Sequence, residues 1–269
     1  MPAFSRVPRI GPMVLSLAVI AALILWAGDL FPVVRAQGVE EPQITIVSPK
    51  DGEVVTANAV PIMLQFSNWT LDCSLAGTPN KAGTGHWHLF LDKGLVNMIC
   101  DPVTTLVLQN VKPGKHVLAA VPAQNDHEEL EKAEVKATFD YQPTNPLPSL
   151  TGLNLGKPTV SILSPKNGAT VSGQTFPLVF DVRNFRLSCD LLGRPKVDGT
   201  GHWHVNVDTT QGPMMGMLTM LAMGCSNSFE VPLAGIKPGT HKVFVLLVDN
   251  LHAPLHPAVE AAVTVTVKK

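Results

Sequence analysis

The chain of 269 residues has room for one large domain or for two domains of about 100–150 residues. Apolar residues make up 45% and charged residues 15%, a composition that excludes an intrinsically disordered chain. The formal net charge is −1, so the chain lacks the basic excess that neutralises phosphates, and we expect no nucleic-acid partner.

Residues 1–36 have the parts of a secretory signal peptide. Arg6 and Arg9 precede an apolar run over residues 13–27, and Val34 and Ala36 occupy the −3 and −1 positions of a cleavage site. The run is slightly short for a membrane span of about 20 residues, which favours cleavage over the alternative of an uncleaved anchor. We expect an exported protein, periplasmic or extracellular, that meets a membrane only through this segment if it stays uncleaved.

The rest of the chain is an internal duplication. Residues 44–92 align with residues 160–208 without a gap, and 20 of these 49 positions are identical. Repeat 2 then carries nine extra residues, so equivalent residues differ by 116 before the insertion and by 125 after it. The duplication predicts two sister domains, residues 39–142 and 156–269, and the proline-rich residues 143–155 predict a semi-rigid linker.

Each repeat has the pattern of short antiparallel strands separated by turns. The predicted strands of repeat 1 are residues 44–47, 61–66, 86–92, 103–108, 116–121 and 134–141, and repeat 2 ends in a similar strand at 263–267. Residues 128–136 are the one candidate helix of the mature chain. Six or seven strands in about 100 residues predict an all-β chain of two tandem immunoglobulin-like antiparallel β-sandwiches.

Eight of the nine histidines form four pairs of equivalent positions: His86/His202, His88/His204, His116/His241 and His127/His252. Side chains alternate along a strand, so His86 and His88 share one face while Trp87 points to the core on the other. Two imidazoles at this spacing can reach one metal ion, and imidazole is the commonest transition-metal ligand near neutral pH. We therefore predict a surface site for copper or zinc in each repeat.

The candidate ligands follow from these pairs. They are His86, His88, His116 and His127 in repeat 1, and His202, His204, His241, His252 and His256 in repeat 2. Asp92 and Asp208 share the face of the strand histidines and are expected to support them. The alternative is a non-catalytic envelope or interaction module whose histidines are structural, and a third hypothesis is an enzyme that uses metal-bound water with Asp92 or Asp208 as general base.

Each repeat also has two cysteines, which in an exported chain predict one disulfide per domain. The pairing with the shortest loops is Cys73–Cys100 and Cys189–Cys225. A copper–thiolate site is the alternative, because Met98 lies near Cys100 in the sequence.

The insertion of repeat 2 is rich in methionine. It contributes Met214, Met215, Met217, Met220 and Met223. Methionine makes adaptable apolar surfaces, which favours a docking surface for an envelope protein, and its thioether is also a soft ligand that favours Cu(I).

The motif Gly-Thr-Gly-His-Trp-His-x-x-x-Asp, followed by Lys-Pro-Gly-(Lys/Thr)-His, resembles a family of exported bacterial domains of unknown function, number 4399. His86, His88, His202 and His204 match that family's first motif, His116 and His241 match its second, and Asp249, His252, Pro254 and His256 match its third. In repeat 1, Asp126 and His127 match the third motif only in part, with Glu131 at the place of His256. Trp87 and Trp203 replace the middle histidine of the family's first motif. The resemblance implies export and a β-sandwich, and it implies no activity.

Overall fold

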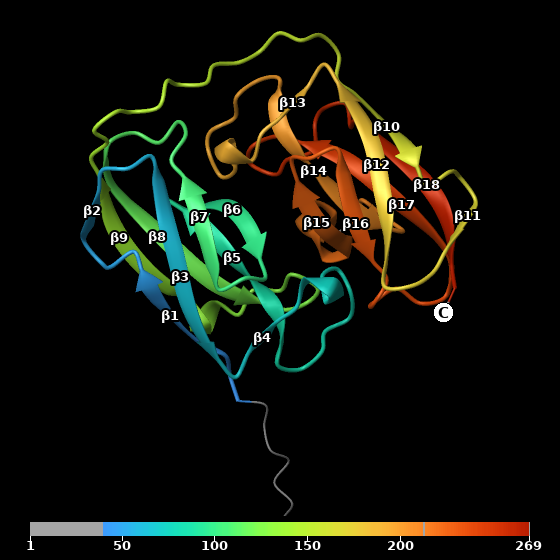
Figure 1. The fold of residues 1–269 in the computed structure, drawn as a ribbon, viewed down its shortest axis with the longest axis horizontal. Helices are drawn as coiled ribbons and strands as arrows, with labels where there is room; N and C mark the ends of the chain where they lie inside the picture. The colour runs from blue at the N-terminus through green and yellow to red at the C-terminus, as the bar shows by residue number, and fades with distance from the viewer. Residues whose placement is uncertain (1–39, 212, 269) are drawn as a thin grey trace, which may run out of the picture. The chain divides into compact units, whose positions relative to one another are not determined.

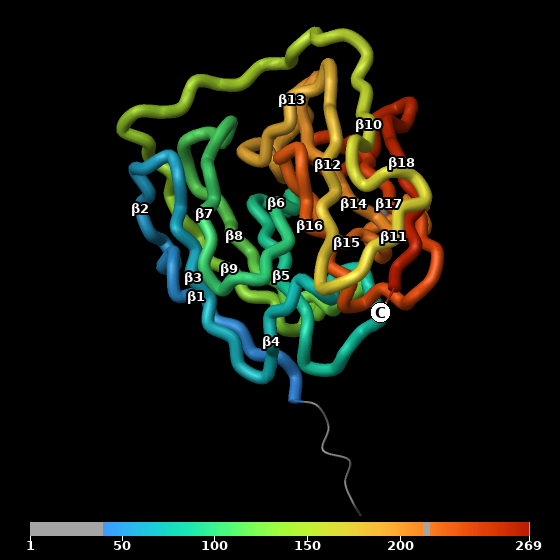
Figure 2. Tube along the Cα trace, turned by 45° about the vertical axis from the view of Figure 1, so that its right-hand side comes forward, coloured from blue at the N-terminus to red at the C-terminus, as the bar shows by residue number. Residues whose placement is uncertain are grey.

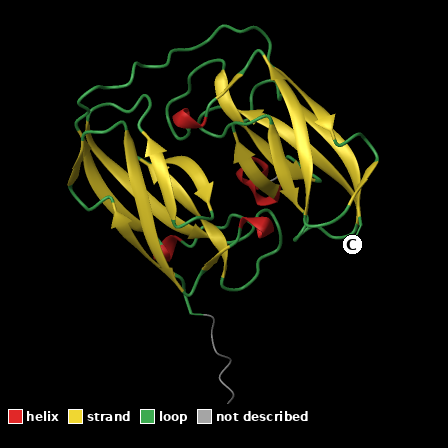
Figure 3. Ribbon diagram, viewed as in Figure 1, coloured by secondary structure: helices red, strands yellow, loops and turns green. Residues whose placement is uncertain are grey.

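Each repeat folds into a β-sandwich, as its alternating apolar runs predict (Figure 1, Figure 3). The structure is a computed structural model that describes residues 40–211 and 213–268, so the predicted signal peptide lies outside the described residues. Both sandwiches belong to one compact unit, Val39–Lys269. Within the described ranges the chain forms strands and short 3-10 turns, and none of its helices is long and apolar enough to cross a bilayer.

Repeat 1 contains a three-stranded and a six-stranded sheet. The small sheet has the order β1-β3-β7, and the large sheet has the order β2-β9-β8-β5-β4 with β6 paired to β5. All pairs are antiparallel except β2 with β9 and β4 with β5. The bounds are β1 (Gln43–Ser48), β2 (Glu53–Val55), β3 (Ala59–Ser67), β4 (Thr70–Leu71), β5 (Thr84–Leu91), β6 (Gly94–Ile99), β7 (Val103–Val107), β8 (Gly114–Ala123) and β9 (Val135–Tyr141), with 3-10 turns η1 (Cys73–Leu75) and η2 (Glu131–Ala133).

Repeat 2 repeats this topology. Its sheets have the orders β10-β12-β16 and β11-β18-β17-β14-β13, with β15 paired to β14. The bounds are β10 (Thr159–Ser164), β11 (Ala169–Val171), β12 (Thr175–Arg183), β13 (Arg186–Leu187), β14 (Thr200–Val207), β15 (Met220–Gly224), β16 (Ser228–Pro232), β17 (Gly239–Val248) and β18 (Glu260–Val267), with 3-10 turns η3 (Cys189–Leu191) and η4 (Pro213–Thr219). The predicted fold class is confirmed.

Several elements differ from the sequence-based expectation, including the short strands β2 and β4, which were not predicted. The candidate helix at residues 128–136 is wrong: Glu129 forms a β-bridge with Ala123, and only the short turn η2 follows before β9 begins. The hairpin strands β6 and β15 were not predicted, although they complete the large sheets beside β5 and β14.

Each sandwich has its own core between its two sheets. In repeat 1, Trp87 and Leu89 on β5 pack with Ile62 on β3, and all three side chains are almost fully buried. In repeat 2, Trp203 and Val205 occupy the equivalent places. The predicted assignment of Trp87 and Trp203 to the core face is confirmed.

The repeats also contact each other directly. Leu192 of repeat 2 belongs to the core cluster of repeat 1, and Met223 packs against that cluster. The buried guanidinium of Arg194 donates to the carbonyl oxygen of Val107 at 2.8 Å across the same boundary. The two cores are therefore joined by side chains as well as by the chain.

Residues 142–158 carry no strand and run from β9 to β10 (Figure 1, Figure 2). The Asn110 side chain bonds both the backbone N–H and the carbonyl of Leu150, and the N–H of Leu153 donates to Asp198 of repeat 2. This segment is thus attached to both repeats by hydrogen bonds.

Candidate metal centres

The strand β5 presents two histidines on the face opposite the core. The preceding Gly85 is required by packing, because a side chain there would collide with the carbonyl of Ala123 on β8. Gly201 has the same relation to Val248 in repeat 2. The Gly-x-Gly-His-x-His motif therefore lets β5 and β14 approach their neighbours closely while holding two imidazoles side by side.

A loop histidine completes a triad in repeat 1. The Nε2 atoms of His86 and His88 lie 3.1 Å apart, and Nδ1 of His127 lies 2.9 Å from Nε2 of His86. One nitrogen from each of the three rings therefore faces a common centre. His127 follows β8 and has a left-handed backbone with φ of 67°, which is uncommon outside glycine and directs the ring back toward β5.

Repeat 2 reproduces the triad with His202, His204 and His252. Nε2 of His202 lies 3.0 Å from Nε2 of His204 and 3.0 Å from Nδ1 of His252, and the third separation is 3.4 Å. The loop residue His252 again has positive φ, at 66°. The two triads are the groups of metal-ligating side chains that the described residues bring together.

The outer nitrogens fix which tautomer each ring has. Nε2 of His127 lies 2.7 Å from the carbonyl oxygen of Met220, which can only accept, so this nitrogen carries the proton. Nδ1 of His88 lies 2.7 Å from a carboxylate oxygen of Glu129 and donates to it. Nδ1 of His127 and Nε2 of His88 therefore both turn lone pairs toward the centre of the triad.

Hydrogen bonds among the three rings alone do not satisfy all of their nitrogens. If His86 supplied a proton from Nε2, that single N–H would face two lone pairs, and its buried Nδ1 would have no hydrogen-bond partner. Nδ1 of His202 is also buried without a partner. A cation held by all three inner nitrogens would accept the lone pairs that face the centre, whereas Nδ1 of His86 and Nδ1 of His202 lack a partner with or without it.

The spacing fits a metal ion. Three nitrogens on a tetrahedral zinc ion, each at about 2.0–2.1 Å, lie about 3.3 Å from one another. The separations between inner nitrogens in the triads are 2.9–3.4 Å. Three protein ligands leave a fourth coordination position for another donor.

Burial favours the neutral form, which is the form that binds metals, in five of the triad histidines. Desolvation, reinforced by His127 and His88, lowers the pKa of His86 to about 2, and desolvation lowers the pKa of His127 to about 4. Burial likewise lowers the pKa values of His202, His204 and His252.

The triads are not on the surface, which corrects the predicted location. Each of the six histidines is at most 4% exposed. The strand β5 is buried on both faces because repeat 2 covers the histidine side. The contacts are reciprocal: His127 donates to Met220 of repeat 2, and Nε2 of His252 donates to Leu95 of repeat 1 at 2.8 Å.

His116 and His241, both candidate ligands, do not join the triads. In the β5–β8 register, His88 pairs with Val121, so His116 lies five residues further along β8 and on the opposite face of the sheet. Its Nδ1 donates to Asp92 at 2.6 Å, and its Nε2 lies 2.8 Å from the carbonyl of Lys112. His241 makes the same two contacts, with Asp208 and Lys237.

Three further candidates also lie elsewhere. Asp92 and Asp208 bond His116 and His241 instead of the triads, because the backbone turns with positive φ at both aspartates as β5 and β14 end. His256 is exposed and belongs to neither triad.

The cysteines pair as predicted, Cys73 with Cys100 and Cys189 with Cys225. No free cysteine is found in the described ranges, so the alternative copper–thiolate site is wrong.

Met220 and Met223 lie on β15, the counterpart of β6, and therefore outside the nine-residue insertion, and the methionines that the structure describes here differ in burial. Met217 and Met220 are buried, and Met223 is half-buried beside the first triad. The side chains of Met214 and Met215 lie outside what the structure describes. Met217 and Met220 are thus not available as a docking surface.

Two residues beside the triads, Glu129 and Met98, were not predicted to lie next to the histidines, although Met98 was named for the copper–thiolate alternative. Nothing in the repeat comparison marks Glu129, because its equivalent in repeat 2 is Pro254. Met98 had a visible signal: it is equivalent to Met223, at the same offset of 125 that relates Cys100 to Cys225.

Comparisons with known proteins give no family. No family model and no curated protein matches the chain. Among solved structures, the fibronectin(III)-like modules of Clostridium thermocellum CbhA share 16% identity, covering 84% of this chain and 94% of that chain at a TM-score of 0.27. CopC from Methylosinus trichosporium OB3b shares 14% identity, covering 40% of this chain and 99% of that chain at a TM-score of 0.24. These TM-scores are too low to carry an argument about the site or the function.

Proposed function

We propose that this is an exported, non-catalytic protein that binds one transition-metal ion, copper or zinc, in each of its two histidine triads. The observation that carries the proposal is the convergence of three buried ring nitrogens, with the outer nitrogens of His127 and His252 held by backbone carbonyls. Metal-ligating histidines characteristically donate their other nitrogen in this way, which fixes the ring for binding.

Burial supports binding rather than catalysis. All six histidines are enclosed between the repeats, whereas a metal enzyme must present its open coordination position to a substrate. Asp92 and Asp208, the predicted general bases, bond histidines outside the triads. The proposal is therefore a metal carrier or store.

Export is supported by two features of the chain. Residues 1–36 have the organisation of a signal peptide, and the four cysteines form two disulfides, which persist in oxidising compartments outside the cytoplasm. With Met217 and Met220 buried, a docking surface for an envelope protein would have to use the remaining part of the insertion.

Metal titration tests the proposal. The protein is purified from an oxidising compartment without chelator or His-tag, analysed for metal, and titrated as the apo form with Cu(I), Cu(II) and Zn(II). We expect two equivalents, one per triad. Binding should also raise the thermal unfolding temperature, because a ligand at about 100 times its dissociation constant stabilises the folded state by about 2.7 kcal/mol.

Variants assign the two equivalents to the triads. His86→Ala with His88→Ala should remove one equivalent, and His202→Ala with His204→Ala the other, whereas the exposed control His256→Asn should keep both. Circular dichroism of each apo variant separates loss of ligands from loss of fold. Absence of stoichiometric binding by any of the three ions would leave a structural module instead.

A further inference from the structure

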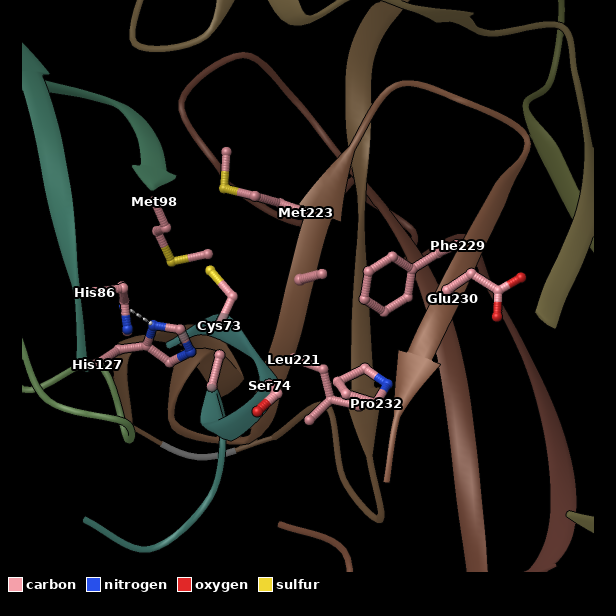
Figure 4. A pocket seen from close by; sticks show the side chains of 12 residues that line it. Cys73, Ser74, His86, Met98, His127, Leu221, Met223, Phe229, Glu230 and Pro232 are labelled. Atoms are coloured by element: carbon pink, nitrogen blue, oxygen red, sulfur yellow. Dashed lines mark hydrogen bonds between the residues drawn. The ribbon is translucent and has the colours of Figure 1, made fainter. Parts of the chain in front are cut away.

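A cavity of about 350 Å³ adjoins the first triad, and His86 and His127 form part of its lining. Two methionines from different repeats, Met98 and Met223, line the same cavity (Figure 4). In Figure 4 their thioethers enter the cavity on the side of the two histidines, away from Glu230.

The positions of the two methionines follow from strand pairing. Met98 on β6 lies directly opposite His88 on β5, and Met223 on β15 lies directly opposite His204 on β14. Opposed residues of antiparallel strands share a face, with Cβ atoms about 4.5–5.5 Å apart. Strand pairing therefore places Met98 and Met223 on the histidine faces of their sheets, and the lining of the cavity shows that both side chains lie next to His86 and His127 of the first triad.

Met98 and Met223 differ from the other methionines because they occupy equivalent positions in the two repeats. Met98 and Met223 are the only two methionines at equivalent positions of the repeats, whereas Met220 is equivalent to Leu95 and Met63 to Val179. Met220 is fully buried, as expected of a side chain that fills a core gap. Met98 and Met223 are half-buried, with their remaining exposure next to a triad.

The donor set around the cavity is soft and almost uncharged. Neutral imidazoles and thioethers favour Cu(I), while the borderline ion Zn²⁺ is bound by nitrogen, thiolate and carboxylate and gains little from a thioether. Cys73, which also lines the cavity, is held in a disulfide and offers no thiolate. Glu230 is the one carboxylate of the lining, and it is exposed.

We infer that Met98 and Met223 form a soft-donor entrance to the first triad, through which this triad takes its metal as Cu(I). The inference rests on the proposed metal-binding function and specifies the ion for one of the two sites. Met98 supplies a donor beside His88 from within the same repeat, and Met223 supplies one across the boundary between the repeats.

The test compares Cu(I) and Zn(II) binding in matched variants. Cu(I) affinity is measured anaerobically with ascorbate by competition against a chromophoric Cu(I) chelator, and Zn(II) affinity by competition against a zinc indicator. The variants are Met98→Leu, Met223→Leu and the double variant. Leucine keeps the side chain apolar and of similar volume. Met63→Leu is the control, because Met63 is an exposed methionine on β3.

We expect Met98→Leu and Met223→Leu each to weaken binding of one Cu(I) equivalent by about 10- to 100-fold, the range seen when a group around a metal site is lost. Zn(II) affinity should stay unchanged in all variants, and Met63→Leu should behave as the unaltered protein.

Three failures are distinguishable. Unchanged Cu(I) affinity in the double variant, together with loss of Cu(I) on replacing His86 and His88, would overturn the role of the methionines and keep the metal function. Absence of Cu(I) and Zn(II) binding by the unaltered protein would overturn the proposed function itself. An equal loss of Cu(I) and Zn(II) affinity in the methionine variants would show that the two side chains only support the fold.

Discussion

Glu129 distinguishes the two triads at the scale of single residues. Its carboxylate accepts from Nδ1 of His88 at 2.7 Å, while the equivalent residue in repeat 2 is Pro254, which has no side-chain acceptor. A carboxylate behind a ligating histidine fixes its tautomer and raises its basicity. The first triad should therefore bind its metal ion more tightly than its geometry alone would give.

We predict that Glu129→Gln weakens metal binding at the first triad by about 10- to 100-fold and leaves the second triad unchanged. Isothermal titration of a protein with both sites would then resolve a weakened step and an unaltered one. Glu131→Gln, which changes an exposed carboxylate two residues away, is the matched control. Equal weakening of both steps by Glu129→Gln would contradict a local role.

Acid should destabilise the apo protein. The pKa values of five triad histidines are lowered in the folded state, to about 2 for His86 and about 4 for His127, while an unfolded chain takes up these protons near pH 6.5. The unfolded state thus binds more protons below pH 6.5. Each such histidine then removes up to about 1.4 kcal/mol of unfolding free energy per pH unit.

Urea unfolding of the apo protein at pH 7.5, 6 and 5 measures this dependence. We expect full stability above about pH 6.5, a decline below it, and a shallower decline in His127→Asn. A free energy of unfolding that is flat from pH 7.5 to 5 would show that the triad histidines are protonated in the folded state.

The histidine pairs could be predicted from strand alternation, but the third ligand could not. His116 and His127 recur equally well in repeat 2, so the repeat comparison gives them equal weight. The choice depends on the β5–β8 register, which places His116 on the core face and leaves His127 to the loop beyond the strand. Register is a property of paired strands and is not contained in the local pattern of either one.

At the scale of elements, the turn between β5 and β6 is held by a small hydrogen-bonded group. Asp92 accepts from the N–H of Val117 at 2.9 Å and from Nδ1 of His116 at 2.6 Å, so it connects the end of β5 to β8. Asp208 and His241 form the same group in repeat 2. We predicted that these four residues, Asp92, His116, Asp208 and His241, take part in metal binding, but they stabilise the fold instead.

We predict that Asp92→Ala lowers the free energy of unfolding by about 1–3 kcal/mol, because it leaves a backbone N–H and an imidazole without their acceptor. Chemical denaturation gives this value, and metal titration of the same variant should still give two equivalents. Loss of one equivalent in a folded Asp92→Ala protein would restore the aspartate to the metal site. The neighbouring substitution Lys93→Ala, at an exposed side chain, is the control.

The strands that carry the core were predictable, whereas β6 and β15 were not. Trp87, Leu89 and Leu91 alternate clearly with the residues between them, and all three are buried. In β6 the buried residues Val96 and Ile99 are three apart, because a shift of register between β5 and β6 interrupts the alternation. A bulge of this kind removes the period-two signal on which strand prediction depends.

At the scale of the whole molecule, the repeats meet through a close backbone contact. A side chain on Gly94 of repeat 1 would collide with the carbonyl of Gly193 in repeat 2. The next residue, Leu95, supplies the carbonyl that accepts from His252. Packing at Gly94 in one repeat therefore controls the position of a histidine in the other.

We predict that Gly94→Ala weakens metal binding at the second triad more than at the first, although the substitution lies in repeat 1. Separation of the two backbones would move the Leu95 carbonyl away from His252. We expect the metal affinity of the second triad to fall about tenfold or more, as it does when other hydrogen bonds to ligating histidines are lost. Metal titration of Gly94→Ala is compared with that of Lys93→Ala, a substitution in the same turn, so that a general effect of changing this turn can be recognised. An unaltered second step would show that the second triad does not depend on repeat 1.

The burial of the triads could not be predicted from one repeat. The histidine face of β5 alternates with an apolar core face, a pattern that normally indicates a solvated side of an antiparallel sheet. Only the second sandwich, packed on that face, removes it from water, and neither sequence pattern nor strand pairing within a repeat reports such a contact.

The two repeats make the same histidine contact with each other, as the two subunits of a symmetric dimer would. Met220 is equivalent to Leu95, so each loop histidine donates to the same carbonyl of the opposite repeat. Two separate chains that met through this self-complementary surface would part on dilution. Joined in one chain, the halves face each other at an effective concentration of about millimolar or higher, whatever the protein concentration. The outer contacts of both triads therefore persist at extreme dilution, where two separate chains would have lost them.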